Sequence, residues 1–263
     1  MEEIIDKKAN AKIKFVGKTL LIEHDDGKGK LERMLVIGDL HLGFEESLNE
    51  SGILVTRIML NEMIKELDEV FAKIRKEEDG KREKIVDKIV LLGDIKHYFG
   101  RIARQEWNDV LHLFGYLSEK STKIIVIRGN HDLVLKPIAR KAGLKVRDYW
   151  IWGGFCFMHG DKDFAELWRK KKREFNYLII GHGHPAVTLR EKVRTEKYKC
   201  FLAGEFRRKK LIILPSFSEW SIGSDAREGK IVLAWKINFD NFNALAVGDN
   251  LEVFDFGKLR SIQ

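Results

Sequence analysis

Side chains able to bind a divalent metal follow nearly every apolar run in the first two thirds of the chain. They are Asp39 and His41 in GDLHLG, Asp94 in LLGDIKH, Asn130 in RGNHD, His159 in FMHGD, and His182 and His184 in IGHGHP. In a layered α/β protein, ligands bind outside the carboxyl ends of the strands, so these seven donors can converge on one place. One tetrahedral metal needs fewer donors, whereas two metals sharing a bridging carboxylate would use all seven. The pattern therefore predicts a dinuclear metal centre.

The apolar runs themselves predict the elements that position these donors. LVIGD, KIVLLGD, KIIVIRGN, FCFMHG and YLIIGH are rich in Ile, Val and Leu, as is typical of strands covered on both faces. Glycines beside the donors allow sharp turns after each strand. Helical periodicity is strong over 57–75 and 107–117, and weaker over 133–144 and 164–175.

The texture changes at about residue 186, where strands separated by turns replace the alternation of strands and helices. The segments AVTLRE, KCFLAGEF, KLIILPSF, KIVLAWKI and NLEVF are predicted strands, and no long helix is expected among them. No linker divides the two parts, so we expect one domain over residues 1–263 with a β-rich C-terminal part.

Composition narrows the class of protein. The chain has 263 residues, of which 44% are hydrophobic and 33% charged, and this balance predicts a soluble globular protein. Two cysteines, Cys156 and Cys200, stand in apolar runs, which excludes a disulfide framework and a cysteine-based zinc site. No signal-peptide core or membrane-length apolar stretch occurs. We therefore expect a cytoplasmic location and no membrane partner.

The formal net charge of +8 suits a polyanionic partner such as nucleic acid. However, glutamine occurs only at positions 105 and 263, while Lys and Glu are abundant, a bias reported for proteins of hyperthermophiles. Charge alone therefore permits a nucleic-acid partner without identifying one.

The blocks DLH, GDIKH, GNHD, HG and GHGH, spread over about residues 34–217, resemble in order the five signature motifs of the calcineurin-like metallophosphoesterase superfamily. A single block arises by chance in many chains, whereas five in order at strand ends are specific. The resemblance implies an α/β fold of the four-layer αββα sandwich type. It implies that Asp94 bridges two metals and that His131 is a nonligand histidine near the phosphate. One metal would be held by Asp39, His41 and His184, and the other by Asn130, His159 and His182.

The chemistry of the donors agrees with that implication. Carboxylate, imidazole and amide oxygen together suit Mn²⁺, with iron, zinc or nickel as alternatives. Two ions roughly 3.5–4 Å apart would activate a bridging hydroxide for in-line attack on phosphorus. His131 could then give a proton to the leaving oxygen. Hydrolysis of a phosphoester is the predicted reaction.

Departures from the family pattern point to a subgroup. Many relatives have GDxxD, whose last Asp orients the histidine of GNH, but this chain has His97 there. The carboxylate partner of His131 is therefore open, with Asp132 and Asp161 as candidates, and we count His97 and Asp132 with His131 as candidate catalytic residues. Protein phosphatases carry DRG and GNHE, which are lacking here. His97 is instead similar to DNA double-strand-break repair nucleases, and the whole chain looks most like the compact SbcD-related phosphoesterases of archaea, without the cap and coiled-coil docking segment of the larger enzymes.

Basic residues supply candidate substrate contacts. Arg169, Lys170 and Arg173 belong to the run RKKKR, which is either a phosphate-backbone contact or a solvated helix face. Arg101 and Arg128 stand close to ligand motifs and are candidates as well. A second basic cluster at 207–210 is expected in a hairpin, where charge mostly serves solubility.

These observations predict a metal-dependent phosphodiesterase or nuclease acting on DNA or RNA. Two alternatives stay open. The first is a small-molecule phosphoesterase for cyclic nucleotides or phosphomonoesters. The second is a weakly active binding subunit of a helicase or nuclease repair complex.

Overall fold

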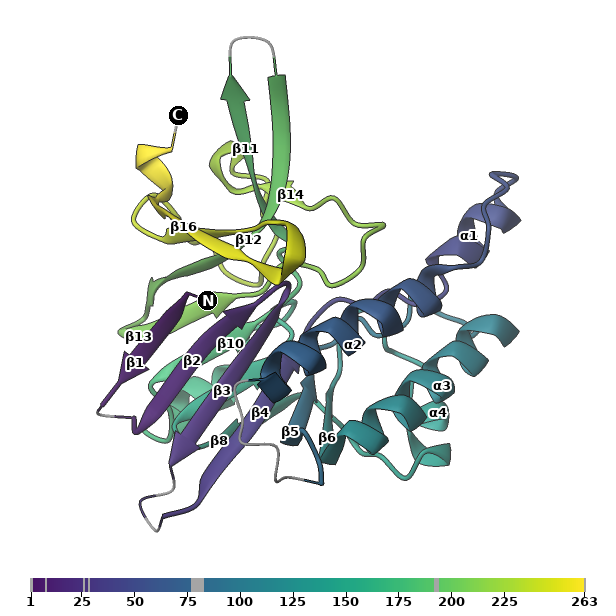
Figure 1. Ribbon diagram of the computed structural model, residues 1–263, viewed down its shortest axis with the longest axis horizontal. Helices are drawn as coiled ribbons and strands as arrows, with labels where there is room; N and C mark the ends of the chain where they lie inside the picture. Colours follow the sequence, from purple (N-terminus) through teal and green to yellow (C-terminus); the bar gives the residue numbers. More distant parts are fainter. Residues whose placement is uncertain are drawn as a thin grey trace.

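The computed structural model describes residues 2–7, 9–25, 27, 29–76, 83–191 and 194–262. Two β-sheets lie face to face, and helices α2, α3 and α4 flank the first of them (Figure 1). The helices are α1 (Phe44–Glu50), α2 (Met59–Lys76), α3 (Arg104–Lys120) and α4 (Lys136–Lys141).

The first sheet follows chain order from β1 to β7. Strands β1 to β4 form an antiparallel meander, whereas β4, β5, β6 and β7 are parallel because α2, α3 and α4 connect them. Its strands are β1 (Glu3–Asp6), β2 (Ala11–Val16), β3 (Thr19–Asp25), β4 (Leu31–Ile37), β5 (Val86–Leu91), β6 (Ser121–Ile127) and β7 (Val146–Arg147).

The second sheet has the order β14-β11-β12-β13-β10-β9-β8, and β15 also pairs with β12 while β16 pairs with β15. Within it β9, β10 and β13 are parallel neighbours. Its strands are β8 (Tyr149–Trp152), β9 (Phe155–Met158), β10 (Tyr177–Ile180), β11 (Pro185–Glu191), β12 (Arg194–Phe206), β13 (Lys209–Ile213), β14 (Ser224–Asp225), β15 (Asn243–Val247) and β16 (Val253–Lys258).

Three apolar layers hold these elements together. One lies between the sheets and includes Phe15, Phe157 and Tyr177, all fully buried. A second packs α2 and α3 on the outer face of the first sheet. The third covers the outer face of the second sheet through side chains such as Leu167 and Trp235.

The predicted α/β sandwich of four layers is confirmed, with one difference in the fourth layer. In the part of the chain that the structure describes, the outer face of the second sheet is covered by a short π-helical turn, Leu167–Lys171, and by irregular chain. The weak helical periodicity over 164–175 agrees with so short an element.

The prediction of a strand over 230–237 is wrong. This segment forms irregular chain that donates a hydrogen bond from Ala234 N to Gly160 O at 2.9 Å and buries Trp235 against the second sheet. Its apolar side chains are buried on the outer face of the second sheet, so the segment does not pair as a further strand at the edge of that sheet. The helix expected over 133–144 is shorter, since α4 covers only Lys136–Lys141.

Among the described residues, no helix combines the length and apolar character needed to cross a membrane.

Replacement of Phe157 tests the layer between the sheets. Phe157 is fully buried and packs beside Trp150 and Phe155. Phe157→Ala is expected to lower the free energy of unfolding by about 3–5 kcal/mol, because it removes buried apolar area and leaves a cavity. Phe254→Ala, at a side chain 46% exposed, should cost less than about 1 kcal/mol. Chemical denaturation measures both, and equal losses would contradict this account of the core.

Candidate metal centre

The seven predicted donors lie at one edge of the sandwich because each follows the end of a parallel strand. Asp39, Asp94 and Asn130 follow β4, β5 and β6 in the first sheet. His159 follows β9, and His182 and His184 follow β10, in the second sheet. The carboxyl ends of both sheets therefore meet at this place.

Three of the donors form a first group. His184 Nε2 lies 3.1 Å from Asp39 Oδ1 and 3.4 Å from His41 Nε2. Asp39 is fully buried, and its carboxylate also accepts the backbone N–H of His182. These three side chains could hold one metal ion.

The other four donors form a second group around His159. Its Nε2 lies 3.1 Å from Asn130 Oδ1, 3.1 Å from His182 Nδ1 and 3.3 Å from Asp94 Oδ2. The same oxygen of Asp94 is 3.9 Å from His41 Nε2, so Asp94 stands between the two groups.

The spacing of the donors fits bound cations. Two ligands each about 2.1 Å from a shared ion are about 3.0–3.4 Å apart in tetrahedral or octahedral geometry. Imidazole nitrogens that face each other at 3.1–3.4 Å need a proton or a cation between their lone pairs. Oxygen and nitrogen donors without thiolate suit divalent manganese, iron or zinc. The residues therefore fit two divalent ions.

The pKa values of the buried carboxylates and imidazoles show that the centre favours bound positive charge. Burial alone would raise the pKa of Asp39, but His184 and His159 beside it lower that pKa below its ordinary value. Burial would lower the pKa of His159, yet Asp94 and Asp39 raise it to about 10. His41 shows the opposite balance, because burial lowers its pKa to about 3 despite Asp94. In the protein alone, the proton of His159 supplies charge that a bound cation would replace.

The backbone at the centre is strained. Five donors have left-handed φ angles between 40° and 65°, a region that costs a residue other than glycine of order 1 kcal/mol or more. They are Asp39, His41, Asp94, His182 and His184. Close approach adds a second requirement, because a Cβ at Gly129 would overlap the Asp94 carboxylate and one at Gly181 would overlap that of Asp39.

Hydrogen bonds behind the donors fix how the imidazoles face the centre. His159 Nδ1 donates to Leu92 O at 2.9 Å, which leaves Nε2 free for a ligand. His184 Nδ1 contacts Ser221 Oγ at 2.9 Å, and Ser216 Oγ donates to Asp39 O at 2.9 Å. Sequence reasoning missed both serines, since they follow β13 and carry no motif.

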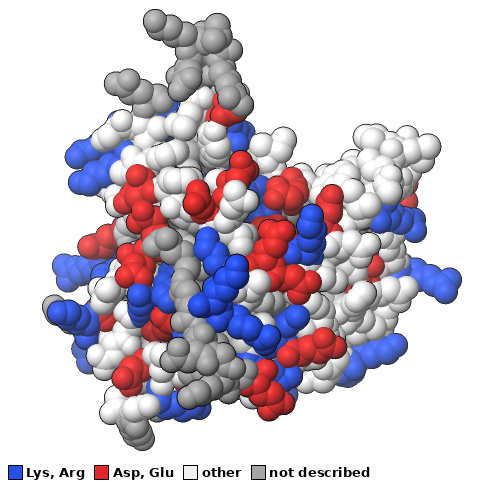
Figure 2. All heavy atoms as spheres, viewed as in Figure 1, with Lys and Arg blue, Asp and Glu red and all other residues white. Residues whose placement is uncertain are grey.

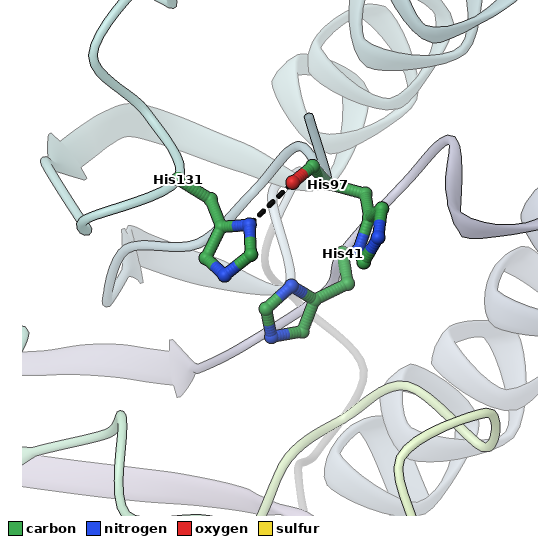
Figure 3. A group of neighbouring side chains, drawn as sticks. All are labelled: His41, His97 and His131. Atoms are coloured by element: carbon green, nitrogen blue, oxygen red, sulfur yellow. Dashed lines mark hydrogen bonds between the residues drawn. The ribbon is translucent and has the colours of Figure 1, made fainter. Parts of the chain in front are cut away.

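His131 finds its partner in a backbone group. Its Nδ1 donates to the carbonyl oxygen of His97 (Figure 3). Its Nε2 lies 3.9 Å from Asp94 Oδ2. The group that orients His131 is therefore the backbone carbonyl of His97, whereas the sequence had suggested the carboxylate of Asp132 or Asp161. The His97 ring, 5.5 Å from that of His131, is partly buried, and this burial lowers its pKa to about 4. Together with His41 the two rings form a cluster of three histidines.

Asp132, which the sequence offered as a carboxylate partner of His131, binds backbone groups of two loops. Its carboxylate accepts backbone N–H groups of Gly129 at 3.0 Å and Ile95 at 3.1 Å, which ties the loop after β6 to the loop after β5. Burial raises the pKa of Asp132 to about 6. Asp161, the other candidate partner of His131, pairs with its neighbour Lys162, whose Nζ lies 3.8 Å from Asp161 Oδ2.

Glu106 in α3 is a residue that sequence reasoning missed. It is fully buried, and its Oε1 accepts the backbone N–H groups of His97 and Tyr98, each at 2.9 Å. Its Oε2 accepts that of Ala103 at 3.3 Å, as expected of a Glu at the third position of a helix. Glu106 therefore fixes the peptide whose carbonyl receives His131, and the position in the first helical turn was the available signal.

The candidate substrate contacts are divided between two places. Arg101 and Arg128 lie on loops beside the centre, where they form ion pairs with Glu50 and Asp148. Arg169, Lys170 and Arg173 belong to the π-helical turn and the residues after it, on the outer face of the second sheet, and Lys170 pairs with Glu166 at 2.7 Å.

Removal of Glu106 should release His131. Glu106→Ala leaves the half-buried N–H groups of Tyr98 and Ala103 without this acceptor, while His97 N–H keeps its bond to Leu42 O at 2.8 Å. The variant is expected to lower the free energy of unfolding by about 2–4 kcal/mol. Ring ¹⁵N NMR should show one tautomer of His131, protonated at Nδ1, in the unaltered protein and a mixture in the variant. Glu119→Ala, at an exposed site in the same helix, is the control and should change neither. Retention of the single tautomer in Glu106→Ala would contradict the assigned role.

Comparison with known proteins agrees with this architecture. The model of the calcineurin-like phosphoesterase family matches residues 32–252. The crystal structure of the nuclease MPE from Pseudomonas putida has a TM-score of 0.57 at 18% identity, and the match covers 97% of this chain and 99% of that one. No curated protein matches the sequence.

Two more distant structures have TM-scores of 0.36. They are Vps29 complexed with zinc from Entamoeba histolytica, at 14% identity over 85% of this chain and 99% of that one, and Yfce, a phosphoesterase from E. coli, at 12% identity over 84% and 95%. The family model covers most of the sequence, including all seven donors, and the protein therefore belongs to the calcineurin-like phosphoesterase family.

Proposed function

We propose that the protein is a dinuclear-metal phosphodiesterase that cleaves nucleic acid. The observation that carries the proposal is the pair of donor groups that meet at Asp94, with His131 beside them. In this assignment Asp39, His41 and His184 hold one ion, and the group around His159 holds the other. Asp94 contributes to both. We propose manganese as the preferred ion, on the oxygen and nitrogen character of the donors.

The residues of the chain have separate tasks in this reaction. When bound, the two ions supply Lewis-acid activation of water and of the phosphoryl group. The His97 carbonyl holds the proton of His131 on Nδ1, so Nε2 faces the centre. There Nε2 can take up a proton from water, and the resulting imidazolium can donate that proton to the leaving oxygen of the ester. Glu106 keeps the carbonyl in place and is a positioning residue.

Two features favour a nucleic-acid substrate. The similar structure from Pseudomonas putida is that of a nuclease, and the match extends over nearly the full length of both chains. The Phe99 ring, 52% exposed, lies 3.7 Å from the ring of His131, where an aromatic surface suits an unpaired base. The net charge of +8 is compatible, although acidic and basic side chains alternate on the face seen in Figure 2.

Activity with and without metal tests the proposal. Protein loaded with Mn²⁺ is expected to hydrolyse bis-p-nitrophenyl phosphate and single-stranded DNA or RNA, and treatment with EDTA should abolish both activities. His131→Ala should lower kcat by about 10²–10⁴-fold, since a proton donor is lost. Asp94→Asn should lower it at least as much, since both ions lose a ligand charge. His112→Ala, at an exposed histidine of α3, is the control.

Two results would contradict the assignment. One is that metal-loaded protein cleaves neither substrate while His131→Ala behaves as the unaltered protein does. The other is that cyclic nucleotides or phosphomonoesters are turned over much faster than any polynucleotide, which would favour the small-molecule alternative. Absence of turnover combined with purification in a helicase or nuclease complex would favour the binding subunit.

Ser221 provides a test of the first donor group that does not depend on turnover. Ser221→Ala removes the partner of His184 Nδ1, and loss of such a partner typically weakens metal binding 10- to 100-fold. Calorimetric titration of the metal-free protein with Mn²⁺ should show this loss at one of two sites. Ser118→Ala, on the exposed part of α3, should bind as the unaltered protein does. Equal weakening at both sites would show that Ser221 acts on the fold in general.

A further inference from the structure

A second feature lies at the other end of the second sheet. A cavity of about 560 Å³ is lined by Trp168, Lys172, Arg173, Asn176, Arg207, Arg208 and Lys209, and we call it the basic pocket. The lining contains five cations and no carboxylate. The two basic runs that look separate in the sequence, one after β9 and one between β12 and β13, thus meet in one place.

The basic pocket is separate from the metal centre. Asn176 precedes the first residue of β10, and Lys209 begins β13, which runs parallel to β10. The donors His182 and His184 follow the last residue of β10. The two sites therefore lie at opposite ends of the same strands, at least about 13 Å apart at the usual rise per residue.

The lining is held in place on aromatic rings. The guanidinium of Arg207 lies 4.9 Å from the Trp168 ring, 5.0 Å from Phe206 and 5.9 Å from Trp235, and it pairs with Asp163 at 3.3 Å. Lys209 Nζ donates to Lys172 O and Phe175 O. Burial and the charge of Lys172 lower the pKa of Lys209. Lys172, Arg173 and Arg208 are exposed around this base. Arg207 and Lys209, which these contacts hold in place, lose little freedom when an anion binds.

The backbone conformation of the turn at Arg207 and Arg208 indicates that the two cations have a function there. Arg207 and Arg208 form the two-residue turn between β12 and β13, and their φ angles are 50° and 62°. Such turns favour Asn-Gly, because both positions need positive φ. The chain instead has two long cations there, at the expense of backbone strain, which is a pattern found at functional sites.

We propose that the basic pocket binds the backbone of a single-stranded nucleic acid, as an anchoring site apart from the metal centre. The cavity is large enough for one or two nucleotides and too small for a duplex, and cations beside an aromatic floor are the means by which proteins follow a single strand. This inference rests on the proposed nucleic-acid substrate. It assigns binding, and no step of hydrolysis, to the pocket.

The test compares two variants that lose equal charge. The pocket variant is Lys172→Gln/Arg173→Gln/Arg208→Gly, in which glycine also suits the left-handed φ at 208. The control is Lys65→Gln/Arg75→Gln/Lys76→Gln, at exposed sites of α2 on the other side of the sandwich. Binding of labelled poly(dT) is followed by fluorescence anisotropy in EDTA, so that neither metal nor turnover contributes.

The pocket variant is expected to bind about tenfold more weakly, and the slope of log K against log salt should fall by about 2, as for three lost phosphate contacts. The control should change the affinity by less than about twofold. Arg208→Gly alone should keep or raise Tm while losing part of the affinity, which separates the loss from unfolding. Equal losses in both triple variants, or no loss in the pocket variant, would overturn the proposal.

Turnover of bis-p-nitrophenyl phosphate distinguishes this inference from the proposed function. Both triple variants should retain the activity of the unaltered protein, because this small diester reaches the metal centre without the pocket. A loss confined to the pocket variant would show that the two sites are not separate and would overturn the inference. If the unaltered protein shows no turnover, the proposed function fails, whereas the binding comparison still decides the role of the pocket.

Discussion

Burial of two carboxylates at one edge is the constraint on which the rest of the structure depends. Asp39 and Asp94 are almost inaccessible to water, and repulsion from Asp94 raises the pKa of Asp39. Charges in such surroundings are costly unless they are paired and hydrogen-bonded. The backbone N–H groups of His182 and His131 and the imidazole of His159 supply part of the compensation. Cations between the donors would supply the remainder.

That arrangement requires a rigid frame, because strained backbone persists only where the surroundings determine it. The apolar layer between the sheets provides the frame, and Val36, Val90 and Ile179 lie in it within a few residues of Asp39, Asp94 and His182. The strain of five left-handed donor residues is thus opposed by burial of the strands that end in them. The geometry of the centre therefore depends on the packing of the core.

Much of the fold and the centre could be predicted from the sequence. Continuous apolar runs identify β4, β5, β6, β9 and β10, and the rule that ligands collect at strand ends brings the seven donors together. The failure at 230–237 has a physical reason, since an apolar alternation is satisfied equally by a sheet edge or by a sheet face. Ser221 and the carbonyl of His97 could not be predicted. The contact of Ser221 with His184 depends on the path of the loop after β13. The carbonyl of His97 is a backbone group that every residue has, so no residue type signals its role.

The direction of the parallel strands explains why net charge says little about this protein. Strand β10 begins beside the basic pocket and ends at the metal centre, so the five cations that line the pocket lie at the opposite end of the strand from the buried carboxylates of Asp39 and Asp94. In the proposed function, cations a strand length away would attract a polyanion with little effect on the carboxylates, because interactions between exposed charges weaken over about 8–10 Å in salt. The sum of +8 hides this separation.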